Sequence, residues 1–314
     1  MTTLVVATDP GFHYLVFGLI VRSDLPLPAL VPHPPAAAQV DIRTLAHEDG
    51  SGAPEGYRLE GDATVLTVPA VGQYRIKGGH SITVTPEPGA SARNVRLFLL
   101  GSALGALLHQ RRLIPLHANA VEIADTAVAF MGHSGAGKST LAAWFLDRGH
   151  GVMTDDVCVV AAEAAGPVVH RGLVRLRLWG EALAHSGRDL VEADRSFDGF
   201  DKFDVAIAPA RLAPASLPLG AAVLLERAEE GEAFALERLH GMHAVEALVA
   251  NVYRGGYAEL AGMAGPLVMA CAALARTIPV LVVRRSWGLD QLDEAGVRIA
   301  QALAEVLPTH VDAR

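Results

Sequence analysis

The sequence predicts a mixed α/β protein in two parts, a small β-rich domain over residues 1–93 and a larger α/β domain over residues 94–314. Three observations lead to this division. The first part holds short apolar stretches separated by turn residues. A helical apolar pattern begins near residue 94, and strand-like and helical stretches are mixed beyond it. A chain of 314 residues is also long enough for two domains.

The N-terminal domain is expected to consist of short strands and turns. The stretch "HYLVFGLIVRSD" (13–24) is strand-like, and the proline-rich stretch "PLPALVPHPP" (26–35) cannot continue as a helix. Three further stretches alternate between apolar and polar residues: "ATVLTV", "QYRIKGG" and "SITVTP". This pattern predicts a β-rich module.

The larger domain is expected to open with one helix over residues 94–112. Asn94 is a suitable N-cap, and apolar residues follow it at helical spacing. Arg111 and Arg112 lie at the end of the stretch, where the helix dipole favours positive charge. We therefore place the domain boundary close to this helix.

The remaining pattern predicts alternating strands and helices. Two strands, 116–123 and 126–131, are joined by the turn "ADT" as a hairpin. A glycine-rich loop follows, then a helix from about Lys138 to Arg148 that ends at Gly149. The later elements are expected as strands 157–161 and 173–179, a polar loop or mobile segment 184–204, a hairpin of strands 221–227 and 233–239, helices 243–254 and 258–276, a strand 278–285 and a helix 292–307.

Composition and charge exclude several classes of protein. The formal net charge is -8 and no run of Lys or Arg stands out, so nucleic acid and anionic membranes are not expected as partners. Cys158 and Cys271 have neither disulfide nor zinc spacing and are expected to be buried thiols. The N-terminus lacks a basic region, and Gly and Pro interrupt the apolar stretch 260–275. A cytoplasmic protein is the expectation.

The glycine-rich loop matches the pattern G-x-x-x-x-G-K-[ST] from Gly132 to Ser139. Its glycines let backbone N–H groups turn toward phosphate oxygens, and the helix that follows adds its positive end. Lys138 is expected to reach the β- and γ-phosphates of ATP, and the Ser139 hydroxyl to bind Mg²⁺. His133 is expected to contribute only its backbone. The residues expected to hold the nucleotide are Gly132, Ser134, Gly135, Ala136, Gly137, Lys138, Ser139 and Thr140.

Two adjacent carboxylates, Asp155 and Asp156, follow the loop lysine by seventeen and eighteen residues. The stretch "GHGVMT" before them is expected to form a strand beside the loop strand in a parallel sheet, with its carboxyl end at the same crevice. One acid would hold Mg²⁺ through water and the other would accept a proton from an attacking hydroxyl. Their mutual repulsion would raise the pKa of one of them. His117 would hydrogen-bond a catalytic carboxylate, or serve as an ordinary structural residue.

These features together resemble the HPr kinase/phosphorylase family. The stretches that carry the resemblance are "LHANAVEI", "GHSGAGKST", "DRGH" and "TDDV", in that order. It implies a P-loop kinase domain similar to phosphoenolpyruvate carboxykinase and HPr kinase, with ATP and Mg²⁺ used to phosphorylate a protein serine. By motif, Asp155 would be the proton acceptor, Asp156 the metal-side acid with Ser139, and His117 their neighbour.

A narrower resemblance extends over more of the chain. "YLVFGLIVRSDLPLPAL", "LRLW", "FDKFD" and "EALVANVYR" are similar to the HPr-kinase-like proteins found with lasso peptide biosynthesis, which implies phosphorylation of the C-terminal serine of a precursor peptide. Lys202 matches a lysine of that group and would contact phosphate or substrate, or remain a solvated loop lysine. Arg175 and Arg177 alternate along one strand face and would meet a phosphate or peptide carboxylate, or remain solvated.

Three functions stay open at the level of sequence. The first is an ATP-dependent serine kinase acting on a peptide or small protein, and the second is a kinase of a small metabolite. The third is a nucleotide-binding regulatory protein without phosphoryl transfer, which is favoured by Val169 standing where the resembled family has a glutamate. The family's C-terminal segment tied to phosphorolysis is not recognisable, so reverse activity is not expected. Homo-oligomer formation is left open.

Overall fold

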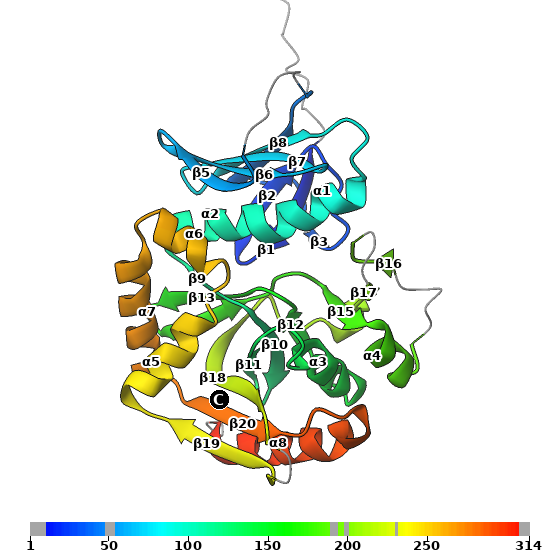
Figure 1. Cartoon of the computed structure of the whole chain (residues 1–314), viewed down its shortest axis with the longest axis vertical. Helices are drawn as coiled ribbons and strands as arrows, with labels where there is room; N and C mark the ends of the chain where they lie inside the picture. Colours follow the sequence, from blue (N-terminus) through cyan, green and yellow to red (C-terminus); the bar gives the residue numbers. More distant parts are fainter. Residues whose placement is uncertain (1–10, 48–53, 189–193, 198–200, 230–231, 308–314) are drawn as a thin grey trace, which may run out of the picture.

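The computed structural model describes residues 11–47, 54–188, 194–197, 201–229 and 232–307. Figure 1 shows the molecule as an upper layer formed by the first strands and a larger lower part built around a second sheet. A row of helices runs between the two (Figure 1). Within the described residues no helix is long and apolar enough to cross a membrane.

The upper layer is an eight-stranded sheet with the order β3-β1-β2-β4-β8-β7-β6-β5. The strand-like run 13–24 is in fact two strands, because Phe17 and Gly18 both have positive φ (53° and 74°) and turn the chain back. The strands are β1 (Phe12–Val16), β2 (Leu19–Ser23), β3 (Val31–Pro32), β4 (Val40–Thr44), β5 (Gly56–Glu60), β6 (Ala63–Val68), β7 (Gly72–Lys77) and β8 (Ser81–Pro86).

The helix predicted over 94–112 is a continuous row of α1 (Ala92–Phe98), a π-helical turn (Leu99–Ala103) and α2 (Leu104–Gln110). Its N-cap is Ser91, whose side chain accepts a hydrogen bond from the backbone N–H of Asn94, so the prediction of Asn94 as the cap is wrong. The row packs its apolar side against the upper sheet in one hydrophobic core.

The second sheet has the strand order β12-β10-β11-β18-β14-β13-β9, and β20 pairs with both β18 and β19. The hairpin predicted over 116–131 is present, as β10 paired with β11. The strands are β9 (Ile114–Leu116), β10 (Ala118–Ile123), β11 (Thr126–Met131), β12 (Val152–Thr154), β13 (Cys158–Glu163), β14 (Gly166–His170), β18 (Ser216–Arg227), β19 (Ala235–Leu239) and β20 (Val280–Arg285).

Two predicted pairings in this sheet are wrong. β18 and β19 do not form a hairpin, because β20 lies between them, parallel to β18 and antiparallel to β19. β12 does not pair with the loop strand β11, because β10 lies between them and is antiparallel to both. Two antiparallel steps restore the direction, so β11 and β12 still end at the same edge of the sheet.

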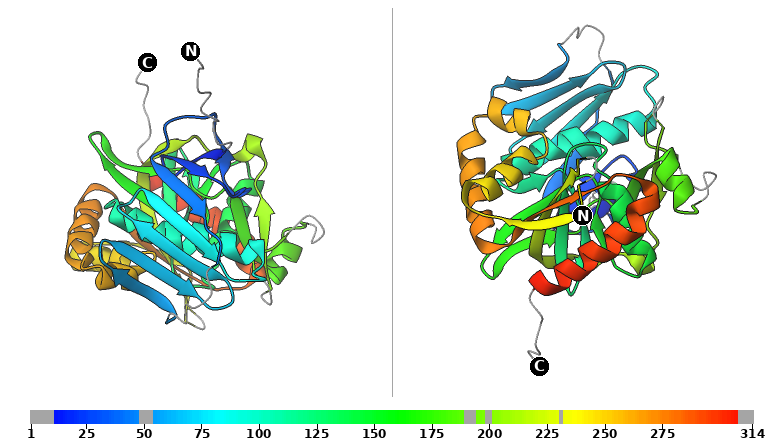
Figure 2. Two further views of the ribbon diagram at one scale, coloured as in Figure 1. Left: turned by 90° about the horizontal axis from the view of Figure 1, so that it is seen from above. Right: turned by 60° about the horizontal axis from the view of Figure 1, so that its bottom comes forward.

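Alternate residues of β11 point to opposite faces of the sheet, as strand geometry requires. Val128 and Phe130 face α3 (Lys138–Asp147) and α8 (Leu292–Val306) in one core. Ala127, Ala129 and Met131 belong to the other core, under α5 (Gly241–Ala250) and α7 (Ala264–Thr277). Figure 2 shows α8 and the pair α5 and α7 on different sides of the sheet. The helix predicted over 258–276 is two helices, α6 (Gly255–Leu260) and α7.

A third, three-stranded sheet has the order β15-β17-β16 and lies beside α4 (Gly180–His185). Its strands are β15 (Arg175–Trp179), β16 (Asp194–Arg195) and β17 (Lys202–Ala206). The polar loop predicted over 184–204 therefore holds the end of a helix and parts of two strands. The rest of that prediction, at 189–193 and 198–200, lies outside the described residues.

Candidate active site

The glycine-rich loop joins the end of β11 to the start of α3, and its shape depends on glycine. Gly132 and Gly137 have φ values of 141° and 79°, a region that favours glycine. A Cβ atom on Gly132 would lie 2.8 Å from the carbonyl oxygen of Leu225. The N–H of Gly132 donates to Oδ1 of Asn251 at 2.9 Å, which fixes the start of the loop.

The ammonium of Lys138 lies within the loop. Its Nζ donates to the carbonyl oxygens of Gly132 (2.6 Å) and His133 (3.1 Å) and lies 3.1 Å from Nε2 of His117. Burial is the main cause that lowers the pKa of Lys138 to about 8. A desolvated cation at this position interacts strongly with phosphate oxygens.

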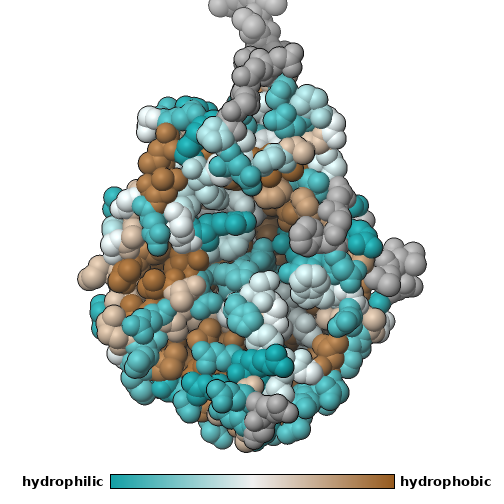
Figure 3. Space-filling model, viewed as in Figure 1, coloured by the Kyte–Doolittle hydropathy of each residue, from teal (hydrophilic) through white to brown (hydrophobic). Residues whose placement is uncertain are grey.

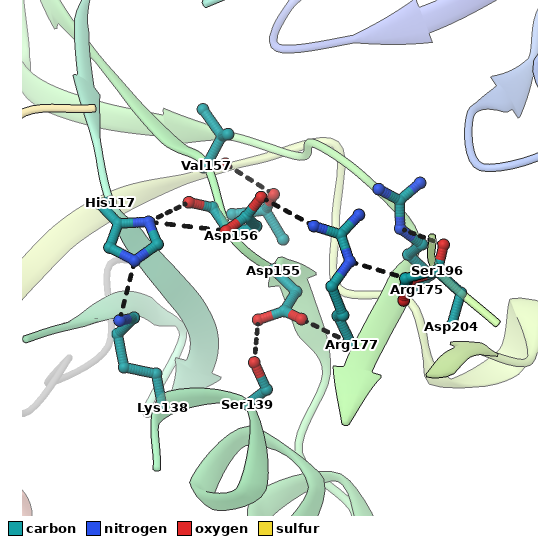
Figure 4. Close-up of polar contacts among 11 residues, drawn as sticks. His117, Lys138, Ser139, Asp155, Asp156, Val157, Arg175, Arg177, Ser196 and Asp204 are labelled. Carbon is teal, nitrogen blue, oxygen red and sulfur yellow. Dashed lines mark hydrogen bonds and ion pairs between the residues drawn. The ribbon is translucent and has the colours of Figure 1, made fainter. Parts of the chain in front are cut away.

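The acid pair follows β12 directly, at the sheet edge where the loop begins. Asp156 has a φ of 73°, an uncommon value for a residue with a side chain, and the two carboxylates make different contacts. Asp155 accepts hydrogen bonds from the hydroxyl of Ser139 (2.8 Å) and from the backbone N–H of Arg177 (2.7 Å). It is therefore held on the side of the phosphate loop (Figure 4).

Asp156 faces a different set of side chains. Its Oδ2 pairs with Nη1 of Arg177 at 3.2 Å, and its Oδ1 lies 3.6 Å from Nδ1 of His117. An ammonium can only donate, so Nε2 of His117 accepts from Lys138 and the ring proton is on Nδ1. That proton is donated to the carbonyl oxygen of Asp156 at 3.2 Å. His117 thus links the loop lysine to Asp156 (Figure 4).

The pKa values of the two carboxylates are shifted in opposite directions. Burial raises the pKa of Asp155, and the neighbouring charge of Asp156 adds to this. Burial also acts to raise the pKa of Asp156, but the cations Arg177, Arg175 and Lys202, together with the nearby His117, outweigh it and the pKa is lowered. Asp156 is therefore the carboxylate held ionised by the protein itself.

The third sheet supplies basic residues to the same site. Arg177 and Arg175 donate from their Nε atoms to the two carboxylate oxygens of Asp204, each at 3.1 Å. Among the described residues, Nη2 of Arg177 is a buried donor without a hydrogen-bond partner. Lys202 begins a strand rather than lying in a loop, and its ammonium is 4.6 Å from the ring centre of Trp179. Burial lowers the pKa of Lys202.

Two cavities meet at the acid pair and the side chains around it. A chamber of about 100 Å³, here called the phosphate chamber, is lined by the loop, both acids, Trp179 and Lys202. A second cavity of about 500 Å³, the large cavity, lies between the helix row and the sheet. In Figure 3 hydrophilic residues gather in the recess below the upper layer. The residues common to both linings are His117, Asp156 and Arg177.

The structure distributes the loop residues expected to hold the nucleotide between these cavities. Gly132 lines the large cavity, and Ala136 is buried with its carbonyl oxygen turned to Arg285. The others line the phosphate chamber: Ser134, Gly135, Gly137, Lys138, Ser139 and Thr140.

Several site residues were missed from the sequence. Asn251 holds both Gly132 and, through its carbonyl oxygen, the N–H of His117 (2.6 Å). Arg285 is 5% exposed behind the loop, and its Nη2 donates to the carbonyl oxygen of Ala136 at 3.3 Å. Tyr253 and Arg254 line the large cavity. The only signal for Asn251 was a polar residue late in a helical pattern.

The side-chain oxygen atoms of Ser139 and Asp155 suit a magnesium ion. Within the described residues, no group of three or more His, Cys, Asp or Glu side chains could hold a metal without other ligands. Mg²⁺ needs only one or two protein ligands when phosphate oxygens and water supply the rest. The Ser139 hydroxyl and the Asp155 carboxylate, 2.8 Å apart, would hold it beside the loop.

Comparison with known proteins gives one relative in sequence. The HPr kinase/phosphorylase of Azoarcus sp. (strain BH72) is 34% identical over 91 residues, which cover 26% of this chain and 28% of that protein. The match thus spans little more than a quarter of the relative's length. No family model matches the chain.

Among solved structures, the Hpr(Ser) kinase/phosphatase from Coxiella burnetii aligns at 14% sequence identity and a TM-score of 0.32. The alignment covers 61% of this chain and 92% of that one. The sequence match supports the resemblance to HPr kinase/phosphorylase proteins. Neither protein is described as a lasso peptide kinase, so that narrower resemblance stays a proposal.

Proposed function

We propose that the chain is an ATP-dependent kinase that phosphorylates a serine hydroxyl of a peptide or small protein. The observation that carries the proposal is the position of Asp156, in the wall that the phosphate chamber shares with the large cavity. A hydroxyl entering from the large cavity would meet a carboxylate and a phosphoryl group at the same point. A protein that only bound nucleotide would not need this second cavity beside the acids.

The ATP side of the proposal rests on the loop. The backbone N–H groups and Lys138 would hold the β- and γ-phosphates, as in other phosphate loops. Ser139 and Asp155 would hold Mg²⁺, which neutralises charge that develops on the phosphate oxygens. Nη2 of Arg177, a buried donor without a hydrogen-bond partner among the described residues, would donate to a transferring phosphoryl oxygen.

The acceptor side rests on Asp156 and His117. The serine oxygen would attack the γ-phosphorus, its proton would pass to Asp156, and ADP would leave with the electrons of the broken P–O bond. His117 would be a positioning residue that orients Asp156 through their contacts. The motif resemblance suggested the reverse allocation, with Asp155 as base, and the raised pKa of Asp155 favours it. Reach to the acceptor favours Asp156, since a base must contact the proton that it removes.

The acceptor is proposed to be a peptide serine because the sequence match is to an HPr kinase/phosphorylase. The narrower resemblance makes the C-terminal serine of a lasso precursor peptide one candidate. A small metabolite is the second candidate, since about 500 Å³ is within the range of small-molecule sites. Incubation with γ-labelled ATP and Mg²⁺ tests this: label should appear on serine peptides and not on free serine. Label on free small alcohols alone would favour the metabolite kinase.

A further inference from the structure

The nucleoside of ATP needs a place beside the phosphate chamber. The volume of that chamber, about 100 Å³, is smaller than the sites of about 300 Å³ or more that usually hold a small organic molecule. In phosphoryl transfer the attacking and leaving oxygens lie roughly in line, on opposite sides of the phosphorus. The acceptor is proposed to enter through the wall at His117, Asp156 and Arg177. ADP and its nucleoside would therefore lie on the side of the chamber away from that wall.

Trp179 belongs to the part of the chamber lining that the large cavity does not share. Within the part of the chain that the structure describes, it is the only aromatic residue of that unshared lining. It is 44% exposed, although tryptophan is highly buried on average. A flat, accessible ring at the edge of a phosphate site offers a surface on which a nucleobase can stack.

The position of Trp179 is set by the elements around it. Leu178 before it and Leu183 of α4 are buried in the same hydrophobic core as the inner side of α3. Figure 1 shows β15 and α4 beside α3, the helix that begins at the end of the phosphate loop. On its other side, Trp179 pairs with Lys202 of β17 in the antiparallel register. The ring is thus carried by elements that pack directly against the helix of the loop.

One contact of the ring is already made by Lys202. Its ammonium lies 4.6 Å from the ring centre, within the range of a cation–π interaction. Lys202 also lines the phosphate chamber, so its charge can act on phosphate oxygens. A ring has two faces, and a cation over one face leaves the other for a base. Trp179 would help binding through the base by stacking, or through the phosphates by placing Lys202.

We propose that Trp179 is the stacking platform for the nucleobase of ATP and that Lys202, over the ring, faces the phosphates. Stacking tolerates different bases because every base has a flat face. The platform would therefore distinguish a nucleoside triphosphate from phosphate alone more than one base from another. The inference rests on the proposed kinase function, because the side on which the acceptor enters determines the side left for the nucleoside.

Calorimetric titration with two probes separates the two ways in which Trp179 could act. The probes are a non-hydrolysable ATP analogue and inorganic triphosphate, which has the phosphates without the nucleoside, each with Mg²⁺. Trp179→Leu should weaken binding of the ATP analogue by about tenfold, within the range for a base stacked on an aromatic ring. Its affinity for triphosphate should stay within about twofold of the wild type. Trp179→Phe should keep most of the affinity for the analogue, because a flat ring remains.

Phe12→Leu is the matched control. Phe12 is exposed to a similar extent, 46%, but lies on β1 of the upper sheet and lines none of these cavities. This variant should bind both probes like the wild type. Circular dichroism checks that each variant is folded.

Two results would overturn the inference. One is a Trp179→Leu variant that binds the ATP analogue as tightly as Phe12→Leu does. The other is an equal loss of affinity for both probes, which would mean that Trp179 acts only by placing Lys202.

Phosphorylation assays on serine peptides separate this inference from the proposed function. Transfer by the wild type, with unchanged affinity of Trp179→Leu for the analogue, would keep the kinase and remove the stacking platform. A loss of affinity confined to the ATP analogue, without transfer to any acceptor by the wild type, would keep the platform and contradict the kinase proposal.

Discussion

The hydroxyl of Ser139 lies 2.8 Å from Oδ1 of Asp155, and this contact separates two neighbouring carboxylates into two environments. It draws Asp155 toward the loop residue that binds Mg²⁺ in phosphate loops. Asp156, next in the chain, stays beside His117 and the large cavity. The two roles proposed for these acids, on opposite sides of a transferred phosphoryl group, rest on this difference in direction.

Asp155→Asn should weaken the apparent affinity of the enzyme for Mg²⁺. The neutral amide keeps an acceptor for Ser139 but loses the charge that attracts the metal ion. We expect the Mg²⁺ concentration for half-maximal rate to rise about tenfold or more, with partial recovery of the rate at high Mg²⁺. Ser139→Ala should act in the same direction. A Mg²⁺ titration that matches the wild type would remove Asp155 from the metal side.

The affinity for ATP should fall as the pH rises past about 8. Burial lowers the pKa of Lys138 to about 8, so its ammonium loses the proton in a range where an exposed lysine keeps it. A neutral lysine attracts phosphate less, and bound phosphate in turn stabilises the ammonium. Equilibrium binding of an ATP analogue from pH 7 to pH 10 measures this. Lys138→Met should bind weakly at every pH, and a pH-independent wild type would contradict the prediction.

Arg285→Met should weaken nucleotide binding without unfolding the protein. The buried guanidinium donates to the carbonyl oxygens of Ala136 and Ser286, and no carboxylate of the described residues pairs with it. Its loss should loosen the loop and weaken affinity for an ATP analogue by about tenfold, the usual range for a charged hydrogen bond. The removal of an unpaired buried cation should leave the melting temperature unchanged or raised.

The matched control for this change is Arg284→Met. Arg284 is the preceding residue of β20, but it pairs with Glu226 and Glu237 away from the loop. The Arg284→Met variant should bind nucleotide like the wild type. Equal nucleotide affinity in both variants would show that Arg285 does not support the loop.

His117→Asn should lower kcat by about ten- to a hundredfold with little change in ATP affinity. Burial, followed by the charge of Lys138, lowers the pKa of His117, so the ring is neutral near pH 7. Protonation at lower pH would remove its acceptor for Lys138 and place two cations together, so kcat should fall on the acid side. The variant should lose that acid limb. A limb that persists unchanged would assign it to another group.

The same shift has a consequence for stability. A histidine with a lowered pKa in the folded state binds its proton more readily when unfolded. Its favourable contribution is therefore fully present above pH 6.5 and is lost as the pH falls below that value. Urea unfolding at pH 7.5 and pH 5.5 should show a larger loss for the wild type than for His117→Asn.

Local spacing was enough to find the loop, the acid pair and His117, because each depends on residues close in sequence. Strand order was not accessible in the same way, since periodicity does not tell which strand lies beside another. β10 therefore came between β11 and β12 unpredicted. Asn251 and Arg285 were missed because they act on Gly132 and Ala136 across 119 and 149 residues. Nothing local marks a polar residue that meets its partner only in the folded chain.

The position of Asp156 is tested most directly by phosphoryl transfer from γ-labelled ATP to serine peptides, with Asp156→Asn beside Asp125→Asn. Asp125 is an exposed turn residue with a φ of 56°, so it controls for the backbone strain that Asp156 shares. We predict that wild type and Asp125→Asn transfer phosphate to the peptide. Asp156→Asn should bind ATP normally but transfer phosphate at least about a hundredfold more slowly. Transfer by Asp156→Asn at the wild-type rate would contradict the account.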